Sequence, residues 1–294
     1  MDFKNIISDT TETLLRMAEL YLPDDVKSAL KSAYESETNE TAKMNLSAIL
    51  KNIELAETNK RPLCQDTGIM IFYVKVGSDF PGLSKIRDGI LEGVKSATSK
   101  IPLRPNAVDP IAQKNSGDNT GRKIPWINWE ITEGDSLEIT AFPKGGGSEN
   151  MSMVGMLTPG LGIKGLKKFV VDTIVRAGGK PCPPTIVGIG IGGGADIAIK
   201  VAKQALLRPL TEPNPDPELA KLEKEIHEAL NATGIGPMGL GGKTTVLGVR
   251  MDYAMRHPAS YPVGVAIQCW AARRATARIS ADGKIEYVTH KEVP

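Results

Sequence analysis

The stretch TIVGIGIGGGADIAIKVAKQALL, residues 185–207, joins an apolar strand directly to a helix. Thr185–Ile191 is a run of β-branched residues and glycines of the length of a buried strand, and Ala195–Leu207 has helical spacing. On either side we expect a helix at Leu161–Ala177 and strands at Thr245–Arg250 and Val263–Cys269. This half of the chain therefore alternates between helices and strands.

Two glycine-rich segments in this half resemble nucleotide-binding loops. Gly188–Gly193 fits the pattern G-x-G-x-x-G between a strand and a helix. A dinucleotide-binding unit also has a second strand that ends in an acidic residue about 20 positions later. Here the proline-rich linker Arg208–Pro217 occupies that position. A tight turn from strand to helix is therefore favoured over a dinucleotide site. The second segment, Gly239–Thr245, resembles a P-loop. The first glycine of that pattern would be at position 237, which is a proline, and the strand comes after the loop instead of before it. Both points disfavour a P-loop NTPase.

The rest of the chain predicts helices and further sheet. Helices are expected through the first 60 residues, where Pro23-Asp24-Asp25 ends one and starts the next. Further on, we expect a strand at Ile69–Val76, a helix at Leu83–Ser99, an irregular segment at 101–124, a strand pair at Trp126–Ile131 and Ser136–Phe142, a capped helix from Pro217, and a hairpin at Ala277–Thr289. We predict an α+β fold, with mixed helices and sheets in one interwoven catalytic domain, 1–294, comprising a helical part, 1–60, and a body, 61–294.

Composition excludes several classes of protein. The chain has 294 residues, with 36 basic and 34 acidic side chains and a net charge of +2. This balance disfavours bulk binding to nucleic acid or anionic membranes. No apolar run reaches about 18 residues, so no membrane span is expected. The start of the chain lacks a secretory signal pattern, and three scattered cysteines suit a reducing compartment. We expect a cytoplasmic protein without a nucleic-acid or membrane partner.

Two groups of residues suggest a site. Cys64, Cys182 and Cys269 are either small buried apolar residues or ligands of a shared metal. Their spacings match no zinc finger, whose ligands come in close pairs. Prolines on both sides of Cys182 keep its backbone out of a regular sheet. Gly145–Gly147, after Lys144, is either a backbone nest for an anion or a flexible loop tip.

Several long motifs resemble the class I fumarate hydratase and L(+)-tartrate dehydratase family, in its alpha subunit. They occur in the family's order from about residue 60 to 275, across most of the chain. The matching stretches are Cys64–Gly68, Leu103–Asn106, Lys144–Asn150, Gly190–Gly193, Gly236–Thr244, His257–Ser260 and Gln268–Trp270.

The resemblance implies an iron–sulfur hydro-lyase. Cys64, Cys182 and Cys269 would hold a 4Fe–4S cluster, leaving one iron without a protein ligand to act as a Lewis acid. The expected reaction is the reversible hydration of fumarate to (S)-malate in the tricarboxylic acid cycle, by an oxygen-sensitive enzyme. The alternatives are an L(+)-tartrate dehydratase alpha subunit and, from another class, a non-catalytic nucleotide-binding or cluster-bearing module.

The resemblance also implies roles for single residues. The dicarboxylate substrate would be bound by Gln65, Arg104, Lys144 and Gly146, and the fork of Arg104 suits a carboxylate. Asp66 would be the acid for the departing hydroxyl, with His257 beside it to set its protonation. The competing interpretations are a helix or turn cap for Asp66 and an ordinary histidine at a helix end for His257.

The resemblance further implies a partner chain. Family enzymes take the base that removes the C3 proton, and further substrate contacts, from a second domain of about 200 residues. We therefore expect a separate beta subunit and a dimer of alpha–beta units. Arg273 and Arg274 could serve that interface, the substrate site or a surface salt bridge, and the sequence does not choose among these.

Overall fold

A computed structural model describes residues 1–290. The chain forms two compact units, each built from separated segments. Unit 1 comprises Met1–Asp24, Asn52–Gly146 and the residues from Arg273 onward, and unit 2 comprises Asp25–Lys51 and Gly147–Ala272. Helices and mixed sheets occur together, which confirms the predicted α+β class. The prediction that 1–294 acts as a single domain stays a prediction.

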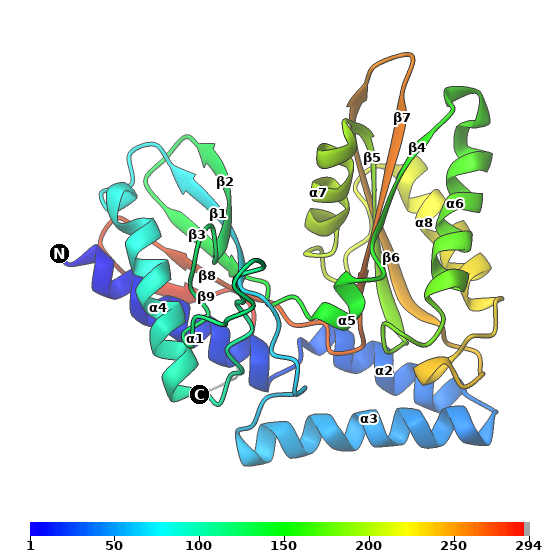
Figure 1. Ribbon diagram of the computed structural model, residues 1–294, viewed down its shortest axis with the longest axis horizontal. Coiled ribbons are helices and arrows are strands. Elements are labelled where there is room, and N and C mark those ends of the chain that lie inside the picture. Colours follow the sequence, from blue (N-terminus) through cyan, green and yellow to red (C-terminus); the bar gives the residue numbers. More distant parts are fainter. Residues whose placement is uncertain (291–294) are drawn as a thin grey trace. The chain divides into compact units, whose positions relative to one another are not determined.

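Unit 1 contains a five-stranded sheet in the order β2-β1-β3-β8-β9 (Figure 1). β1 and β2 are parallel, and the other neighbours are antiparallel. Its strands are β1 (Ile71–Gly77), β2 (Trp126–Thr132), β3 (Leu137–Ala141), β8 (Ala275–Ile279) and β9 (Ile285–Tyr287). The expected C-terminal hairpin is therefore confirmed as β8 and β9.

The predicted pairing of the two strands around Glu133–Asp135 is wrong. Both strands form, but β1 lies between them and pairs with each. The turn wraps around the end of β1 instead, where Gly77 N donates to Ser136 O and Asp79 N donates to Gly134 O. β1 is largely buried and rich in β-branched and aromatic residues, so a central position with a partner on each side suits it.

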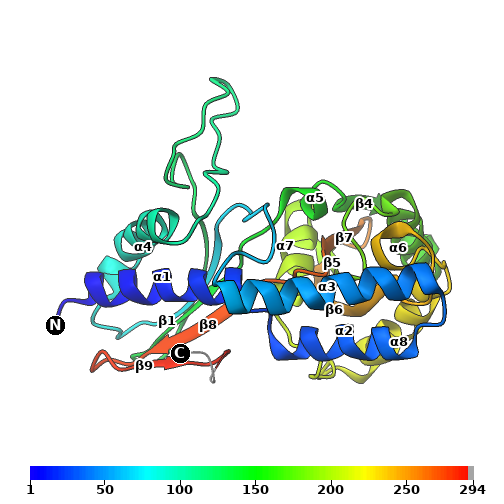
Figure 2. The same ribbon diagram turned by 90° about the horizontal axis from the view of Figure 1, so that it is seen from below.

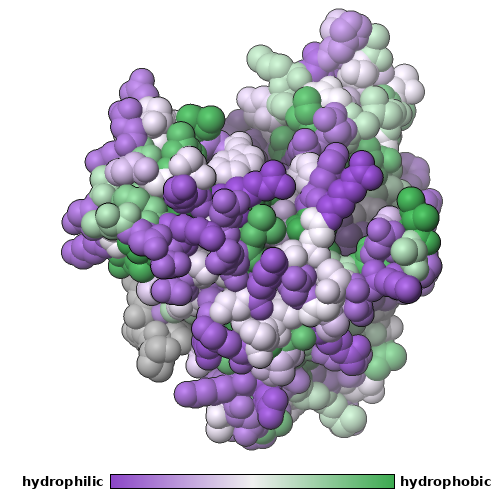
Figure 3. Space-filling model, turned by 60° about the vertical axis from the view of Figure 1, so that its left-hand side comes forward, coloured by the Kyte–Doolittle hydropathy of each residue, from purple (hydrophilic) through white to green (hydrophobic). Residues whose placement is uncertain are grey.

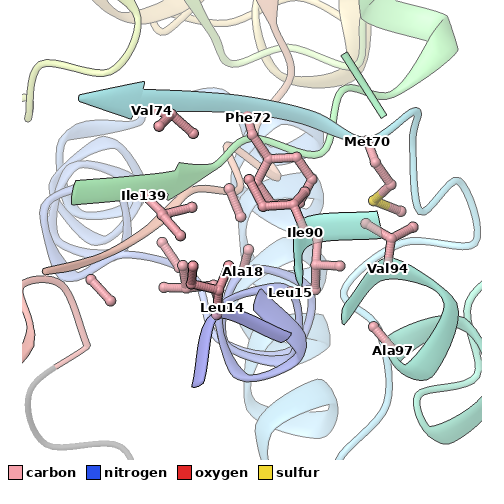
Figure 4. Packing of buried hydrophobic residues seen from close by; sticks show 14 of the residues in the cluster. Leu14, Leu15, Ala18, Met70, Phe72, Val74, Ile90, Val94, Ala97 and Ile139 are labelled. Carbon is pink, nitrogen blue, oxygen red and sulfur yellow. The ribbon is translucent and has the colours of Figure 1, made fainter. Parts of the chain in front are cut away.

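Two helices of unit 1 pack against this sheet and against each other. They are α1 (Phe3–Leu20) and α4 (Ile86–Lys100), the latter preceded by the 3-10 turn η1 (Leu83–Lys85). Figure 4 shows apolar side chains of α1, α4, β1 and β3 pointing toward one another. Leu14, Phe72 and Ile90 are fully buried there. This core anchors the start of β1, which follows the predicted cysteine loop.

The irregular segment 101–124 projects from unit 1 as a long loop (Figure 2). Its base is held by Asn119, a fully buried residue. The Asn119 side chain donates to Arg104 O at 2.9 Å and to Thr98 Oγ1 at 3.1 Å, and it accepts from Asn106 N at 2.7 Å. These bonds fix the backbone around Arg104 to helix α4.

Unit 2 contains a four-stranded sheet in the order β4-β7-β5-β6. Helix α7 covers one face, and α6 and α8 cover the other (Figure 1). Its strands are β4 (Met153–Leu157), β5 (Thr185–Gly193), β6 (Val246–Arg256) and β7 (Tyr261–Gln268). The further helices and turns of the described chain are α2 (Asp24–Ser36), α3 (Glu40–Asn59), α5 (Gly146–Glu149), η2 (Pro159–Leu161), α6 (Gly162–Ala177), α7 (Ala195–Ala205), α8 (Pro217–Asn231) and η3 (Pro237–Gly239).

Two glycines of the G-x-G-x-x-G segment have a packing role. Gly188 and Gly190 lie inside β5, where α7 crosses it. A Cβ at Gly188 would lie 2.1 Å from Ala202 O, and one at Gly190 would lie 2.0 Å from Ala198 O. The glycines let the helix backbone approach the strand directly, which supports the structural interpretation over a dinucleotide site.

Replacing Gly190 by alanine is expected to destabilise unit 2 by about 3 kcal/mol or more, since backbone atoms occupy the space that the methyl group needs. The matched control is Gly160→Ala, because a Cβ at Gly160 meets nothing within 4 Å. Urea unfolding of the two variants measures the difference. Equal stability of both would contradict the packing role.

The surface is mainly polar on the face seen in Figure 3, where apolar residues form small separate groups. Among residues 1–290, no helix has the length and apolarity needed to cross a membrane.

Candidate active site

The centre of the site in unit 1 is the carboxylate of Asp66, in the loop between α3 and β1. Its Oδ1 accepts a hydrogen bond from Gly68 N at 2.9 Å, and its Oδ2 accepts one from Gly146 N at 2.7 Å. Asp66 N donates to Cys64 Sγ at 3.4 Å. The turn-cap interpretation is therefore correct for one oxygen, while the other joins this loop to the glycine segment after β3.

Gln65 and Arg104 meet beside this loop. Arg104 Nη2 donates to Gln65 Oε1 at 3.3 Å, and both side chains are exposed. The backbone of Arg104 is tied to the same loop, since its N donates to Thr67 Oγ1 at 3.1 Å. Asn106 adds a bond from Nδ2 to Gly68 O at 3.1 Å. The structure thus brings Gln65 and Arg104 together, next to Asp66 in the sequence, and presents a guanidinium and an amide to solvent.

The glycine segment closes the site from the other side. Lys144 and Ile69 form a backbone bridge, and Gly68 passes so close that a Cβ there would lie 2.7 Å from Lys144 N. Gly68 has φ +75°, which also favours glycine. The predicted anion nest is partly internal, because the N–H of Gly146 binds the Asp66 carboxylate. Lys144 is only 1% exposed, and its contact with substrate stays a prediction.

Two of the three cysteines lie in neighbouring loops of unit 2. Cys182 O accepts a hydrogen bond from Trp270 N, which follows Cys269, at 3.3 Å. Cys182 has φ +55°, an unfavourable backbone conformation for a residue with a Cβ. Such conformations concentrate at functional sites. All three cysteines are partly exposed, which argues against the interpretation as fully buried apolar residues.

The residues near Cys269 fit a further polar group. Gln268 is 2% exposed, and neither polar atom of its side chain has a hydrogen-bond partner in the described chain. An unsatisfied buried amide is costly, so a bound group beside Cys269 would relieve that cost. Thiolates are also the usual ligands of iron–sulfur clusters. Within residues 1–290 no three His, Cys, Asp or Glu side chains form a metal-binding group, and Cys64 belongs to the other unit. The shared ligand set stays a prediction.

His257 lies in the turn between β6 and β7 and is exposed. Its Nδ1 accepts a hydrogen bond from Ala259 N at 3.1 Å, so the proton of the neutral ring is on Nε2. Arg256 Nη1 binds the carbonyl oxygens of His257, Pro258 and Ser260 and holds the turn. Asp66 and His257 belong to different units, and their pairing stays a prediction.

Sequence reasoning missed a buried ion pair behind the Asp66 loop. Arg273 Nη1 lies 2.9 Å from Glu19 Oε2, with exposed fractions of 1% and 0%. Arg273 Nη1 also donates to Asp66 O at 2.7 Å. The surface salt bridge considered for Arg273 is thus replaced by a buried one. The available signal was weak, namely a glutamate inside the apolar run Met17–Leu20.

Burial raises the pKa of Glu19 from 4.5 to about 7, because the loss of hydration outweighs the attraction of Arg273. The folded state then holds its proton more tightly than the unfolded state, so stability falls as pH rises from about 5 to 7. Between pH 5 and 7 the free energy of unfolding of the native chain is expected to fall by up to about 3 kcal/mol relative to that of Glu19→Gln.

Urea unfolding at pH 5, 6, 7 and 8 measures this difference, with the exposed Glu130→Gln as control. A wild-type to Glu19→Gln difference that stays constant with pH would contradict the assignment.

Comparison with known proteins shows the family of the chain. The family model described as "Fumarate hydratase (Fumerase)" matches residues 8–278. The chain belongs to the fumarate hydratase family. It is 52% identical over 95% of its length to a Methanocaldococcus jannaschii protein provisionally named L(+)-tartrate dehydratase subunit alpha, and covers 99% of that protein. It is 38% identical over 97% of its length to the L(+)-tartrate dehydratase subunit alpha of Escherichia coli K12, and covers 95% of it. This is a family of hydro-lyases, so the resemblance drawn from the motifs is confirmed.

Proposed function

We propose that this chain is the alpha subunit of an iron–sulfur hydro-lyase that hydrates fumarate reversibly to (S)-malate. The observation that carries the proposal is the hydrogen bond between Arg104 and Gln65, the neighbour of Asp66 in a loop whose carboxylate is held by Gly68 N and Gly146 N. A guanidinium fork and an amide suit a substrate carboxylate, and a carboxylic acid next to them can transfer a proton. The loop that holds Gln65 and Asp66 begins at Cys64.

We assign the cofactor ligands to Cys64, Cys182 and Cys269. The neighbouring positions of the last two, and the unsatisfied amide of Gln268, support this assignment. When bound, a 4Fe–4S cluster with one iron lacking a protein ligand would supply a Lewis acid for the substrate hydroxyl. Such an iron also explains the oxygen sensitivity that we expect. A cytoplasmic location follows from the need for reduced thiolates.

The residues of unit 1 then divide the remaining work. Arg104 and Gln65 hold one carboxylate of the substrate. Lys144 and the backbone at Gly146 are assigned further substrate contacts, as the family resemblance implies. In the dehydration direction the protonated Asp66 gives its proton to the departing hydroxyl, which leaves as water. Hydration returns that proton to Asp66. His257 would set the protonation of Asp66.

The base that takes the C3 proton is assigned to a beta subunit, together with further substrate contacts. The names of the relatives, which are alpha subunits, support such a partner. We propose a dimer of alpha–beta units, by analogy with the family. The same names favour L(+)-tartrate dehydration as the second candidate function.

Steady-state kinetics of the chain assembled anaerobically with its beta subunit test the proposal. We expect kcat/KM for (S)-malate to exceed that for L(+)-tartrate by about tenfold or more. The reverse preference would select the second candidate. Turnover of neither substrate, together with thermal stabilisation by a dinucleotide, would instead favour the non-catalytic binding module.

A further inference from the structure

Arg273 lies directly behind the two loops that form the candidate active site. Its Nη1 donates to Asp66 O at 2.7 Å and contacts Glu19 Oε2 at 2.9 Å. Its Nη2 would lie 3.2 Å from a Cβ at Gly145, and the same Cβ would lie 3.2 Å from Asp66 Oδ2. One guanidinium therefore faces the backbone of both loops that hold the Asp66 carboxylate.

Stability alone is a weak reason for this arrangement. Arg273 and Glu19 are almost completely buried, and taking two charges out of water is costly. Replacing a buried ion pair by apolar residues is often neutral or stabilising. The polar pair therefore calls for another benefit, and what distinguishes it is the second hydrogen bond of Arg273, to the Asp66 carbonyl.

The backbone of Glu19 and the side chain of Arg273 fix the loop at two points. Leu63 N donates to Glu19 O at 2.8 Å just before Cys64, and Arg273 binds the carbonyl of Asp66 just after it. The two amides that bind the Asp66 carboxylate, Gly68 N and Gly146 N, depend on the loop keeping this course.

We propose that Arg273 is a positioning residue, which, supported by Glu19, fixes the Asp66 loop so that the carboxylate stays aimed between the amides of Gly68 and Gly146. The inference rests on the proposed function, because it assigns the benefit to proton transfer by Asp66. Lysine does not replace arginine here, because Nη1 donates to both acceptors while Nη2 packs beside Gly145, and an ammonium offers one nitrogen in place of these two.

The first test is a double-mutant cycle in the assembled enzyme, with rates normalised to bound iron. We expect Arg273→Lys to lower kcat tenfold or more, with KM changed less than threefold. In an Asp66→Asn background the same change should cost less than threefold, because the group that it positions is already gone. The matched control is Arg278→Lys, an exposed arginine paired with Glu138, with an expected change below twofold. A full tenfold loss in both backgrounds would overturn the proposal.

The second test does not depend on activity. Hydrogen exchange at the Gly146 amide should become at least tenfold faster in Arg273→Lys, while exchange in β5 stays unchanged. Glu19→Gln keeps an acceptor for Arg273, so its exchange and kcat should stay within threefold of the native chain. Unchanged exchange at Gly146 in Arg273→Lys would contradict positioning even if the enzyme proves to act on another substrate. Loss of the proposed function alone would leave this exchange result intact.

Discussion

Asp66→Asn is expected to lower kcat by about 100-fold or more while the chain keeps its iron, since general acid–base groups contribute rate factors of this order. An amide has no proton of suitable acidity for a departing hydroxyl. Measurement of kcat and iron content on the same anaerobic preparation checks both parts. The structural cost of the change is limited, because the amide oxygen can still accept from Gly68 N or Gly146 N.

The matched control is Asp135→Asn, in the exposed connection between β2 and β3. It should change kcat less than twofold. If Asp66→Asn retains full iron and kcat within threefold of the native enzyme, Asp66 is not the acid. If both iron and activity disappear, hydrogen exchange of the loop is measured in Asp66→Asn and compared with that in Arg273→Lys. Faster exchange in both variants indicates a displaced loop, and native exchange in Asp66→Asn indicates a lost proton donor.

Cys182→Ser is expected to remove most of the bound iron and at least about 90% of the activity, because a hydroxyl is a harder and weaker ligand for iron than a thiolate. Serine keeps the size of the side chain, so the turn in which Cys182 N donates to Gly179 O should persist. Iron and labile sulfide per chain are the measurements. Equivalent losses are expected for Cys64→Ser and Cys269→Ser.

His227→Gln is the matched control in unit 2. Burial lowers the pKa of His227, whose ring contacts Asn231 in helix α8. A neutral imidazole can bind a metal, but His227 has no assigned role, so it serves as a control. Its replacement should leave the iron content unchanged. Full iron retention in Cys182→Ser would remove Cys182 from the ligand set.

Local features of the chain were predictable where a residue type strongly favours one position, such as the end of a helix. Asp216 caps α8 with Pro217 in its first turn, as expected for a capped helix from Pro217. The expected end of the helix at Ala177 is confirmed, with Gly178 following at φ +54°, which glycine adopts without strain. The order of strands was not predictable in the same way. A short polar turn between two apolar strands favours a hairpin, and the insertion of β1 between them depends on contacts far apart in the chain.

The candidate site shows the same division. Gln65, Asp66 and Arg104 were predicted because long motifs surround them, and the structure brings them together. Glu19 was missed because a single acidic residue in a helix normally faces solvent. Its burial depends on a cationic partner 254 residues later in the chain. The role of Gly146 was predicted in kind, as a backbone donor to an anion, but the anion bound to it is Asp66.

Electron paramagnetic resonance of the anaerobically reconstituted chain, recorded after brief oxidation with and without (S)-malate, tests the central claim most directly. We predict about four irons per chain. A 3Fe–4S signal should appear as the iron without a protein ligand is lost, and with the beta subunit present the spectrum should change when malate is added. A chain that binds no iron after reconstitution, with Cys182 readily alkylated in the folded protein, would contradict the account.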